Sequence, residues 1–252
     1  MSVPGRLRRV GGLLDPGRLR FFVRKLRHPI APGHLVVDVG SGGDPHPRAD
    51  VIVDNSVDAN FHRTVAFRRS APTVVADVMA LPFRDHAFDY SICSHVLEHL
   101  DDPAGAAAEL SRISRAGYVE TPSDIHEKLF PMTWHKWMVR LDGGRLRFEA
   151  KPSAMLDERL GDWFSGRWER DRSMMRFVWS HTDELFVQHH WVGRLDVETV
   201  GTPAVWFTPE EADEELQRPD APDSSDAKRR VYDVAARFRY RRPRARTRAR
   251  AR

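Results

Sequence analysis

The sequence has a single cysteine and lacks any long hydrophobic run. With only Cys93 among 252 residues, an intramolecular disulfide is excluded, and such sparse cysteine usage fits a reducing cytoplasm. No stretch reaches the roughly 18 apolar residues that a transmembrane helix requires. The N-terminal region carries basic residues without the continuous apolar segment of a signal peptide. We therefore expect a cytoplasmic protein. Cys93 lies in an apolar run, so we expect its side chain to be packed in the core.

Acidic residues are scarce at both ends of the chain and dominate its middle. Residues 1–27 and 228–252 each contain one acid among many Lys and Arg, and they contribute +7 and +11 to the formal charge. The whole chain is only +4, so residues 28–227 carry −14. This acidic body disfavours polyanion binding by the body itself. Weak polyanion contact is expected instead through residues 241–252, which hold seven arginines without apolar spacing.

Residues 35–45 organise the rest of the sequence. The run 35–39 is apolar and β-branched except for Asp38, which predicts a buried parallel strand. The glycines that follow, among them Gly40 and Gly42, permit a tight turn and a close approach of a ligand to the backbone. Ligands of open parallel sheets bind beyond the carboxyl ends of the strands. Taken alone, this pattern fits an ordinary strand-to-loop turn equally well.

A second segment makes the pattern specific. Residues 81–89 read Leu-Pro-Phe-x-Asp-x-x-Phe-Asp, and residues 96–103 read Val-Leu-Glu-His-x-x-Asp-Pro. Together with the glycine turn, this signature resembles the class I S-adenosylmethionine-dependent methyltransferases, in particular a broad small-molecule family, over residues 35–123. The resemblance implies an α/β fold with a Rossmann-like, doubly wound and mostly parallel sheet. It also implies S-adenosyl-L-methionine as the cofactor and methyl transfer, to O or N of a small-molecule or saccharide-like acceptor, as the activity.

The resemblance also places the cofactor contacts. Asp54 ends the predicted strand 51–54 where the family binds the ribose hydroxyls, although an Asp followed by Asn and Ser also favours a turn. Asp77 ends the predicted strand 73–78, where it would accept a hydrogen bond from the adenine amino group, with the amide of Val78 facing the ring. The full set of predicted cofactor-binding residues is Asp38, Gly40, Ser41, Gly42, Asp54, Asp77, Val78 and Ser94.

Methyl transfer needs alignment of donor and acceptor and, for some acceptors, removal of a proton. The candidate bases are His95, Glu98 and His99, which follow the predicted strand 88–94, with His126 and Glu127 as weaker candidates. Glu98 and His99 could also serve packing, and in some relatives acidic residues in a similar segment bind a divalent metal. The histidines follow no metal-site spacing, so we predict no metal.

One departure from the family supports an alternative function. Few residues separate Pro45 from the strand at 51–54, so the helix that usually follows the glycine turn must be very short or absent. Since the N-terminus of that helix would help to hold the cofactor, a non-catalytic methyltransferase-like binding protein stays open. A dinucleotide-dependent oxidoreductase is disfavoured, because the turn lacks the third glycine of G-x-G-x-x-G.

The predicted domains are residues 1–33, 34–207 and 208–252. The first is a basic amphipathic segment, with a helix over 16–27 whose basic face points to solvent; the second is the methyltransferase domain; the third is a linker followed by a basic, disordered tail.

The end of the predicted domain is less regular. Residues 123–175 are rich in Trp and Phe and predict either an insertion that caps the site or a packed helical pair. A hairpin of 174–179 with 185–191 is expected at the sheet edge, followed by strands over 195–200 and 204–207 and a short helix over 231–238.

Overall fold

The structure is a computed structural model that describes residues 23–57, 67–132, 134–152 and 171–203, together with residues 16, 21, 155, 163 and 167. The predicted strand over 204–207, the helix over 231–238 and the whole segment 208–252 lie outside the described residues. No helix among those described is long and apolar enough to cross a membrane.

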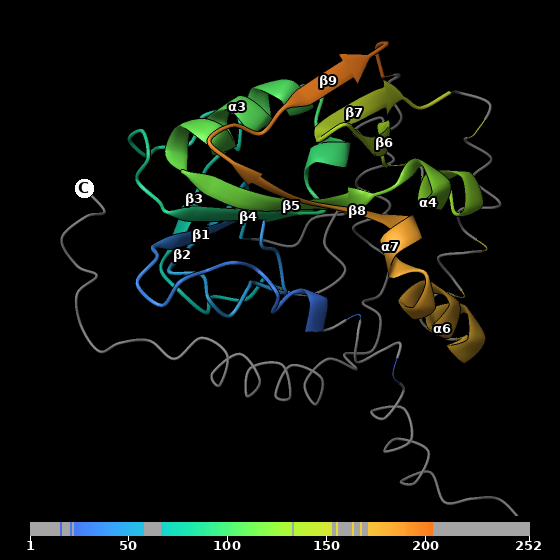
Figure 1. Ribbon diagram of the computed structural model, residues 1–252, viewed down its shortest axis with the longest axis horizontal. Helices are drawn as coiled ribbons and strands as arrows, with labels where there is room; N and C mark the ends of the chain where they lie inside the picture. Colours follow the sequence, from blue (N-terminus) through green and yellow to red (C-terminus); the bar gives the residue numbers. More distant parts are fainter. Residues whose placement is uncertain are drawn as a thin grey trace, which may run out of the picture.

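A six-stranded sheet forms the centre of the molecule (Figure 1). Its strand order is β3-β2-β1-β4-β5-β8, and all neighbours are parallel except β8, which runs antiparallel to β5 at the edge. The strands are β1 (Val36–Val39), β2 (Val51–Asp54), β3 (Thr73–Val75), β4 (Tyr90–Ser94), β5 (Ala116–Pro122) and β8 (Phe186–Val192). This arrangement confirms the expected mixed α/β fold with a mostly parallel, Rossmann-like sheet.

The two faces of the sheet are covered differently, because successive residues of a strand point to opposite sides. Val37 and Val39 of β1 belong to the larger core cluster together with Leu110 of α3 (Pro103–Ile113). Val36 points the other way and joins a smaller cluster with Ile30, from the segment that precedes β1. Helix α3 therefore covers one face, whereas an irregular N-terminal segment covers the other (Figure 1).

A second, three-stranded sheet packs on the α3 side and has the order β6-β7-β9. Its strands are β6 (Trp137–Asp142), β7 (Arg145–Ala150) and β9 (Val197–Val200). Trp137 and Phe148 are buried there in the main core, with their rings edge to face at 6.3 Å. Where residues 123–175 are described, these aromatic residues therefore act as core. Core packing agrees with the second expectation, but Trp137 and Phe148 lie on strands β6 and β7 and not in a helical pair. The capping insertion stays a prediction.

The prediction of a hairpin at the sheet edge was wrong for its first strand, residues 174–179. Residues 174–179 lie in helix α6 (Arg172–Ser180), whose Asp171 cap accepts a hydrogen bond from the Ser173 amide. The run is short and apolar, and such a run fits a strand and a helix equally well until a cap is recognised. The remaining helical elements are the 3₁₀ turn η1 (Leu97–His99), α4 (Asp124–Leu129) and α7 (Thr182–Leu185).

The connection between β1 and β2 has no helix, as the sequence predicts. Other predicted strands were displaced by a few residues: β3 ends at Val75 and β4 begins at Tyr90.

The N-terminal helix is present at residues 16, 21, 23 and 24, but its basic face is not wholly in solvent. Arg24 is only 9% exposed and pairs with Glu120 of β5. Long-range pairing of this kind overrides the amphipathic pattern.

Candidate active site

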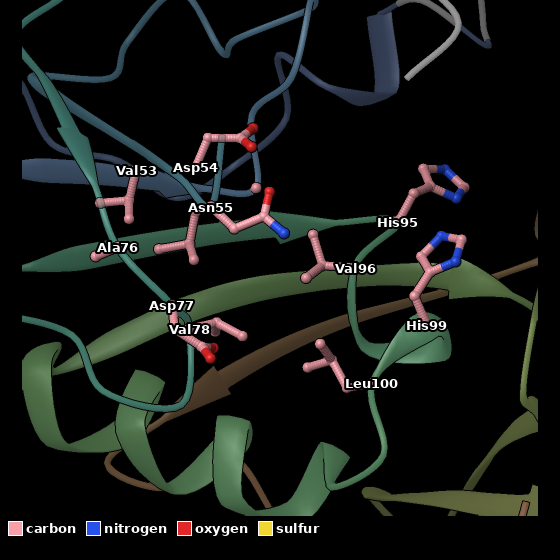
Figure 2. Close-up of a pocket in the computed structure, with 12 residues that line it drawn as sticks. Val53, Asp54, Asn55, Ala76, Asp77, Val78, His95, Val96, His99 and Leu100 are labelled. Atoms are coloured by element: carbon pink, nitrogen blue, oxygen red, sulfur yellow. The ribbon is translucent and has the colours of Figure 1, made fainter. Parts of the chain in front are cut away.

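A pocket of about 270 Å³ opens at the carboxyl ends of β1, β2 and β4 and beside the loop after β3 (Figure 2). Its size is close to the lower end of the range for ligand pockets, about 300–1,000 Å³. The residues that line it are Val39, Gly40, Val53, Asp54, Asn55, Ala76, Asp77, Val78, His95, Val96, His99 and Leu100. This is the edge where ligands bind in open parallel sheets.

Gly40 has no side chain and lines the pocket with its backbone. Its φ of +72° is left-handed, and a Cβ added there would lie 2.2 Å from Cγ2 of Val96. Any side chain at Gly40 would therefore be strained and would clash with Val96. The glycine turn holds the polypeptide close to the loop that follows β4 and leaves its backbone accessible to a ligand.

Asp54 and Asp77 lie on the β2–β3 side of the pocket, at the far side from the two histidines (Figure 2). Asp54 is buried and accepts hydrogen bonds from the amides of Gly42 (2.9 Å) and Ser56 (3.3 Å). Asp54 thus lines the pocket, and its carboxylate also stabilises the turn over Asn55 and Ser56, which is the alternative role expected from the sequence. Asp77 is exposed, and its Oδ1 accepts from the amide of Met79 at 2.9 Å. Both carboxylates are held in place by backbone donors before any ligand arrives.

Asp38 supports the glycine turn from behind. It is 4% exposed, does not line the pocket, and accepts a hydrogen bond of 2.6 Å from the amide of His46. Burial raises the pKa of Asp38 to about 7, because removing the carboxylate from water disfavours its charged form. Of the other predicted site residues, Ser41, Gly42, Ser94 and Glu98 are also outside the pocket lining.

His95 projects from the end of β4 with an unusual backbone. Its φ is +56°, and its amide donates to the carbonyl of Glu120 at 2.8 Å. The ring Nε2 lies 3.1 Å from Oε1 of Glu120, and Nδ1 lies 3.4 Å from Oε1 of Glu98. Burial alone would lower the pKa of His95, but the two carboxylates outweigh it and raise the pKa to about 9. His95 is therefore a cation at neutral pH.

Glu120 gathers a buried polar network beside the pocket. Its side chain is fully buried and accepts from Arg24 (Nε, 3.1 Å) and from the hydroxyl of Tyr118. Burial opposes ionisation, yet the charges of Arg24 and His95 hold the pKa of Glu120 well below its usual range. The network fastens the N-terminal segment to the carboxyl end of β5.

Glu98 belongs to η1 and is 1% exposed. It lies next to His95 and His99. Its Oε1 is 3.9 Å from Nε2 of His99, and neither of its oxygens accepts a hydrogen bond of good geometry from the described part of the chain. Although burial would raise the pKa of Glu98, the surrounding imidazoles, with His95 first, keep it lowered. Glu98 is thus a buried anion next to the pocket wall.

Comparison with known proteins identifies the region that builds this pocket. Residues 38–119 match the family described as "Methyltransferase domain". This part of the chain is therefore similar to methyltransferase domains. Demethylmenaquinone methyltransferase of Renibacterium salmoninarum is 33% identical in an alignment of 92 residues that covers 34% of this chain and 39% of that protein. The match therefore spans about two fifths of the length of this relative.

The solved structures that are similar to this chain include two whose descriptions name a methyltransferase. One is a chain from the complex of the Haloferax volcanii Trm112 methyltransferase activator with a methyltransferase (21% identity, TM-score 0.35, covering 47% of this chain and 59% of that one). Another is a SAM-dependent methyltransferase from Thermotoga maritima (15% identity, TM-score 0.34, covering 75% and 92%).

The pocket brings together six of the residues singled out from sequence. These are Gly40, Asp54, Asp77, Val78, His95 and His99. Sequence reasoning missed Arg24 as a partner of Glu120, because the two residues are 96 positions apart and carry no shared local pattern. It also missed the grouping of His135 with Glu98 and His99.

Proposed function

We propose that this protein is an S-adenosylmethionine-dependent methyltransferase that binds its cofactor in the pocket at the carboxyl ends of β1, β2 and β4. The observation that carries the proposal is the convergence of Gly40, Asp54 and Asp77 on one pocket within a methyltransferase domain. In this proposal Asp54 binds the ribose hydroxyls and Asp77 the adenine amino group, while the backbone at Gly40 faces the methionine end.

The donor set of the pocket fits this ligand. A carboxylate can accept hydrogen bonds from two adjacent hydroxyls, and the Asp54 carboxylate is already oriented by the Gly42 and Ser56 amides. Apolar side chains of Val53, Val78 and Leu100 line the same pocket and would exclude water from an aromatic ring. When bound, the cofactor supplies an electrophilic methyl group on a sulfonium.

The residues at the other end of the pocket would handle the acceptor. His95 is a cation at neutral pH, so it suits orientation of an anionic or polar acceptor better than removal of a proton. His99 also lines the pocket, and its Nδ1 lies 3.3 Å from the carbonyl of Trp134. If Nδ1–H donates there, the lone pair lies on Nε2, and His99 becomes the better placed of the candidate bases.

The acceptor proposed is a small-molecule or saccharide-like compound methylated at O or N. The net charge of −14 on residues 28–227 supports this choice, because it repels a phosphate backbone. Transfer of radiolabelled methyl to bulk RNA or DNA should be negligible, both in the full chain and after removal of residues 228–252. Efficient labelling of nucleic acid by the shortened chain would reject this part of the proposal.

A binding protein without catalysis is the alternative, favoured by the missing helix between β1 and β2. Calorimetric titration with S-adenosylmethionine and S-adenosylhomocysteine tests binding, which both readings share, and turnover against a panel of small acceptors separates them. Binding of both compounds with no transfer to any acceptor class would support the alternative.

Asp77→Ala tests the cofactor assignment directly. We expect it to weaken binding by about 1–3 kcal/mol, because a buried adenine amino group would lose its partner. The matched control is Asp196→Ala, an exposed carboxylate paired with Arg145 on the second sheet, which should leave binding unchanged. Equal affinity of the Asp77 variant and the unmodified protein would remove Asp77 from the site.

A further inference from the structure

Three potential metal ligands meet beside the pocket. Glu98, His99 and His135 each place one ligand atom within 4.8 Å of those of the other two. Glu98 and His99 belong to η1, whereas His135 comes from the segment between α4 and β6. The cluster is enclosed, since Glu98 is 1% and His135 7% exposed. These three residues, called here the EHH cluster, are a compact set of one carboxylate and two imidazoles.

The carboxylate of the EHH cluster is buried and only partly compensated. Neither oxygen of Glu98 accepts a hydrogen bond of good geometry from the described residues, and the nearest ring nitrogen, Nδ1 of His95, lies 3.4 Å from Oε1. Buried carboxylates in proteins are usually paired closely or bind metal ions, and a metal ion would give Glu98 the direct partner that His95 provides only at longer range. The 3.9 Å between Oε1 of Glu98 and Nε2 of His99 is only slightly longer than the roughly 3.4 Å between two ligands of a tetrahedral Zn²⁺.

Both histidines are held in the way that metal-binding histidines are held. Nδ1 of His135 lies 2.6 Å from Oε1 of Glu127, and Nδ1 of His99 lies 3.3 Å from the carbonyl of Trp134. A ring that donates from Nδ1 carries its lone pair on Nε2, and a carboxylate or carbonyl acceptor is the usual partner behind a metal-ligating histidine. The rings pack edge to face with centroids 4.8 Å apart.

Glu127, which accepts the hydrogen bond from the His135 ring, is itself held in place by an ion pair. Glu127 is fully buried and pairs with the fully buried ammonium group of Lys151. Burial opposes ionisation of Glu127, but the charges and hydrogen bonds of His135 and its neighbours lower the pKa far below the usual range. Glu127 therefore remains an anion that fixes the His135 ring, and the support extends from α4 to the end of β7.

We propose that the EHH cluster binds a divalent transition-metal ion, with Zn²⁺ as the best match to its donors. Two imidazoles and one carboxylate with an open fourth position are a common Zn²⁺ set, whereas Mg²⁺ prefers oxygen ligands. Sequence spacing could not show this site, because His135 is 36 positions from His99 and joins it only through the fold.

The site would border the methyl-transfer pocket, because His99 lines that pocket. With an ion bound, His99 would be a ligand rather than a base, and the ion could instead acidify an acceptor hydroxyl in its open position. Metal binding does not depend on the proposed methyl transfer, so it is tested without cofactor or acceptor.

The experiment is a calorimetric titration of untagged, chelator-treated full chain with Zn²⁺, with Mg²⁺ in a parallel titration. We expect one Zn²⁺ per chain and negligible Mg²⁺ binding. Glu98→Gln and His135→Gln should each weaken Zn²⁺ binding by about 100-fold or more, since even changes in supporting residues cost about 10–100-fold. His181→Gln, which changes an exposed histidine of the same type, should bind like the unmodified protein.

Co²⁺ absorption provides a readout that does not require the variants to fold. The unmodified protein should give the visible spectrum of a four-coordinate site with nitrogen and oxygen ligands, and Zn²⁺ should abolish it. Absence of saturable Zn²⁺ binding and of a Co²⁺ spectrum in the unmodified protein would overturn the proposal. So would folded ligand variants, checked by circular dichroism, that bind Zn²⁺ as tightly as His181→Gln does.

Discussion

At the scale of single residues, His46 shows how burial can couple folding to pH. It is 5% exposed, its Nε2 lies 2.7 Å from the carbonyl of Lys25, and its Nδ1 accepts from the Arg48 amide at 3.1 Å. Both nitrogens are thus used by the neutral ring, and a second proton would displace the Arg48 donor. Burial, followed by the nearby positive charges, lowers the pKa of His46 to about 4.

His46 should therefore destabilise the protein in acid. Its folded pKa is below the unfolded value, so the folded state binds fewer protons and the free energy of unfolding falls as pH drops from about 6.5 to about 4. The loss from this residue is on the order of 3 kcal/mol. Asp38 acts oppositely: its pKa is raised to about 7, so its contribution to stability falls as pH rises from about 4 to 7.

Comparison with His46→Gln separates the two effects. Asp38 and the other buried histidines, which are His28, His126 and His135, are present in both proteins, so the difference between the unfolding curves in urea at several pH values reports the replacement of His46. The variant should be less stable near pH 7.5 and should lose less stability toward pH 4. Parallel pH profiles of the two proteins would show that His46 does not titrate in this range.

At the scale of secondary-structure elements, α3 illustrates a local rule that the sequence reveals. Asp102 precedes Pro103, and its Oδ1 accepts from the Gly105 amide at 2.8 Å, as expected of a helix N-cap. The helix buries Ala106 and Leu110 against the sheet, so fraying of its first turn would reach the core.

Asp102→Ala should lower the free energy of unfolding by about 1 kcal/mol, the usual effect of losing an N-cap carboxylate. Asp142→Ala, at the exposed end of β6, is the control and should change stability by less than about 0.5 kcal/mol. Chemical denaturation of the three proteins measures both values. A loss no larger in the capping variant than in the control would mean that the cap contributes nothing to folding.

The elements that sequence reasoning found are those with local signals. The strand and glycine turn at 35–45 and the absent helix after β1 both depend on residues close together in the chain. The β6–β7 hairpin also had such a signal that was missed. Gly143 and Gly144 join its strands, and both have left-handed φ, typical of a two-residue hairpin turn.

The parts that could not be predicted depend on contacts between distant segments. Arg24 belongs to the basic face of an amphipathic pattern, and only the fold places it against Glu120. The strand expected over 174–179 became a helix because a short apolar run does not define its own periodicity. The EHH cluster likewise needs β6 to return beside η1.

At the scale of the whole molecule, charge is separated between the ends and the body. A chain ending at Gln217 should keep the described fold and its affinity for S-adenosylmethionine, because the pocket and all described core residues precede that position. Retention on heparin should fall sharply, since the shortened chain loses the +11 of residues 228–252. In the full chain this retention should decrease steeply with salt.

Circular dichroism, calorimetry and heparin chromatography of the two chains measure these outcomes. Loss of cofactor binding by the shortened chain at moderate salt would contradict the proposed domain boundary and would place residues after Gln217 in the folded domain.

We expect the pocket at the carboxyl ends of β1, β2 and β4 to bind the cofactor. A crystal structure of the full chain with S-adenosylhomocysteine tests it most directly. We expect electron density with the adenine beside Asp77 and Val78, the ribose hydroxyls on Asp54 and the homocysteine end at Gly40. Density for the compound elsewhere, or an unliganded pocket under conditions where calorimetry shows saturation, would contradict it.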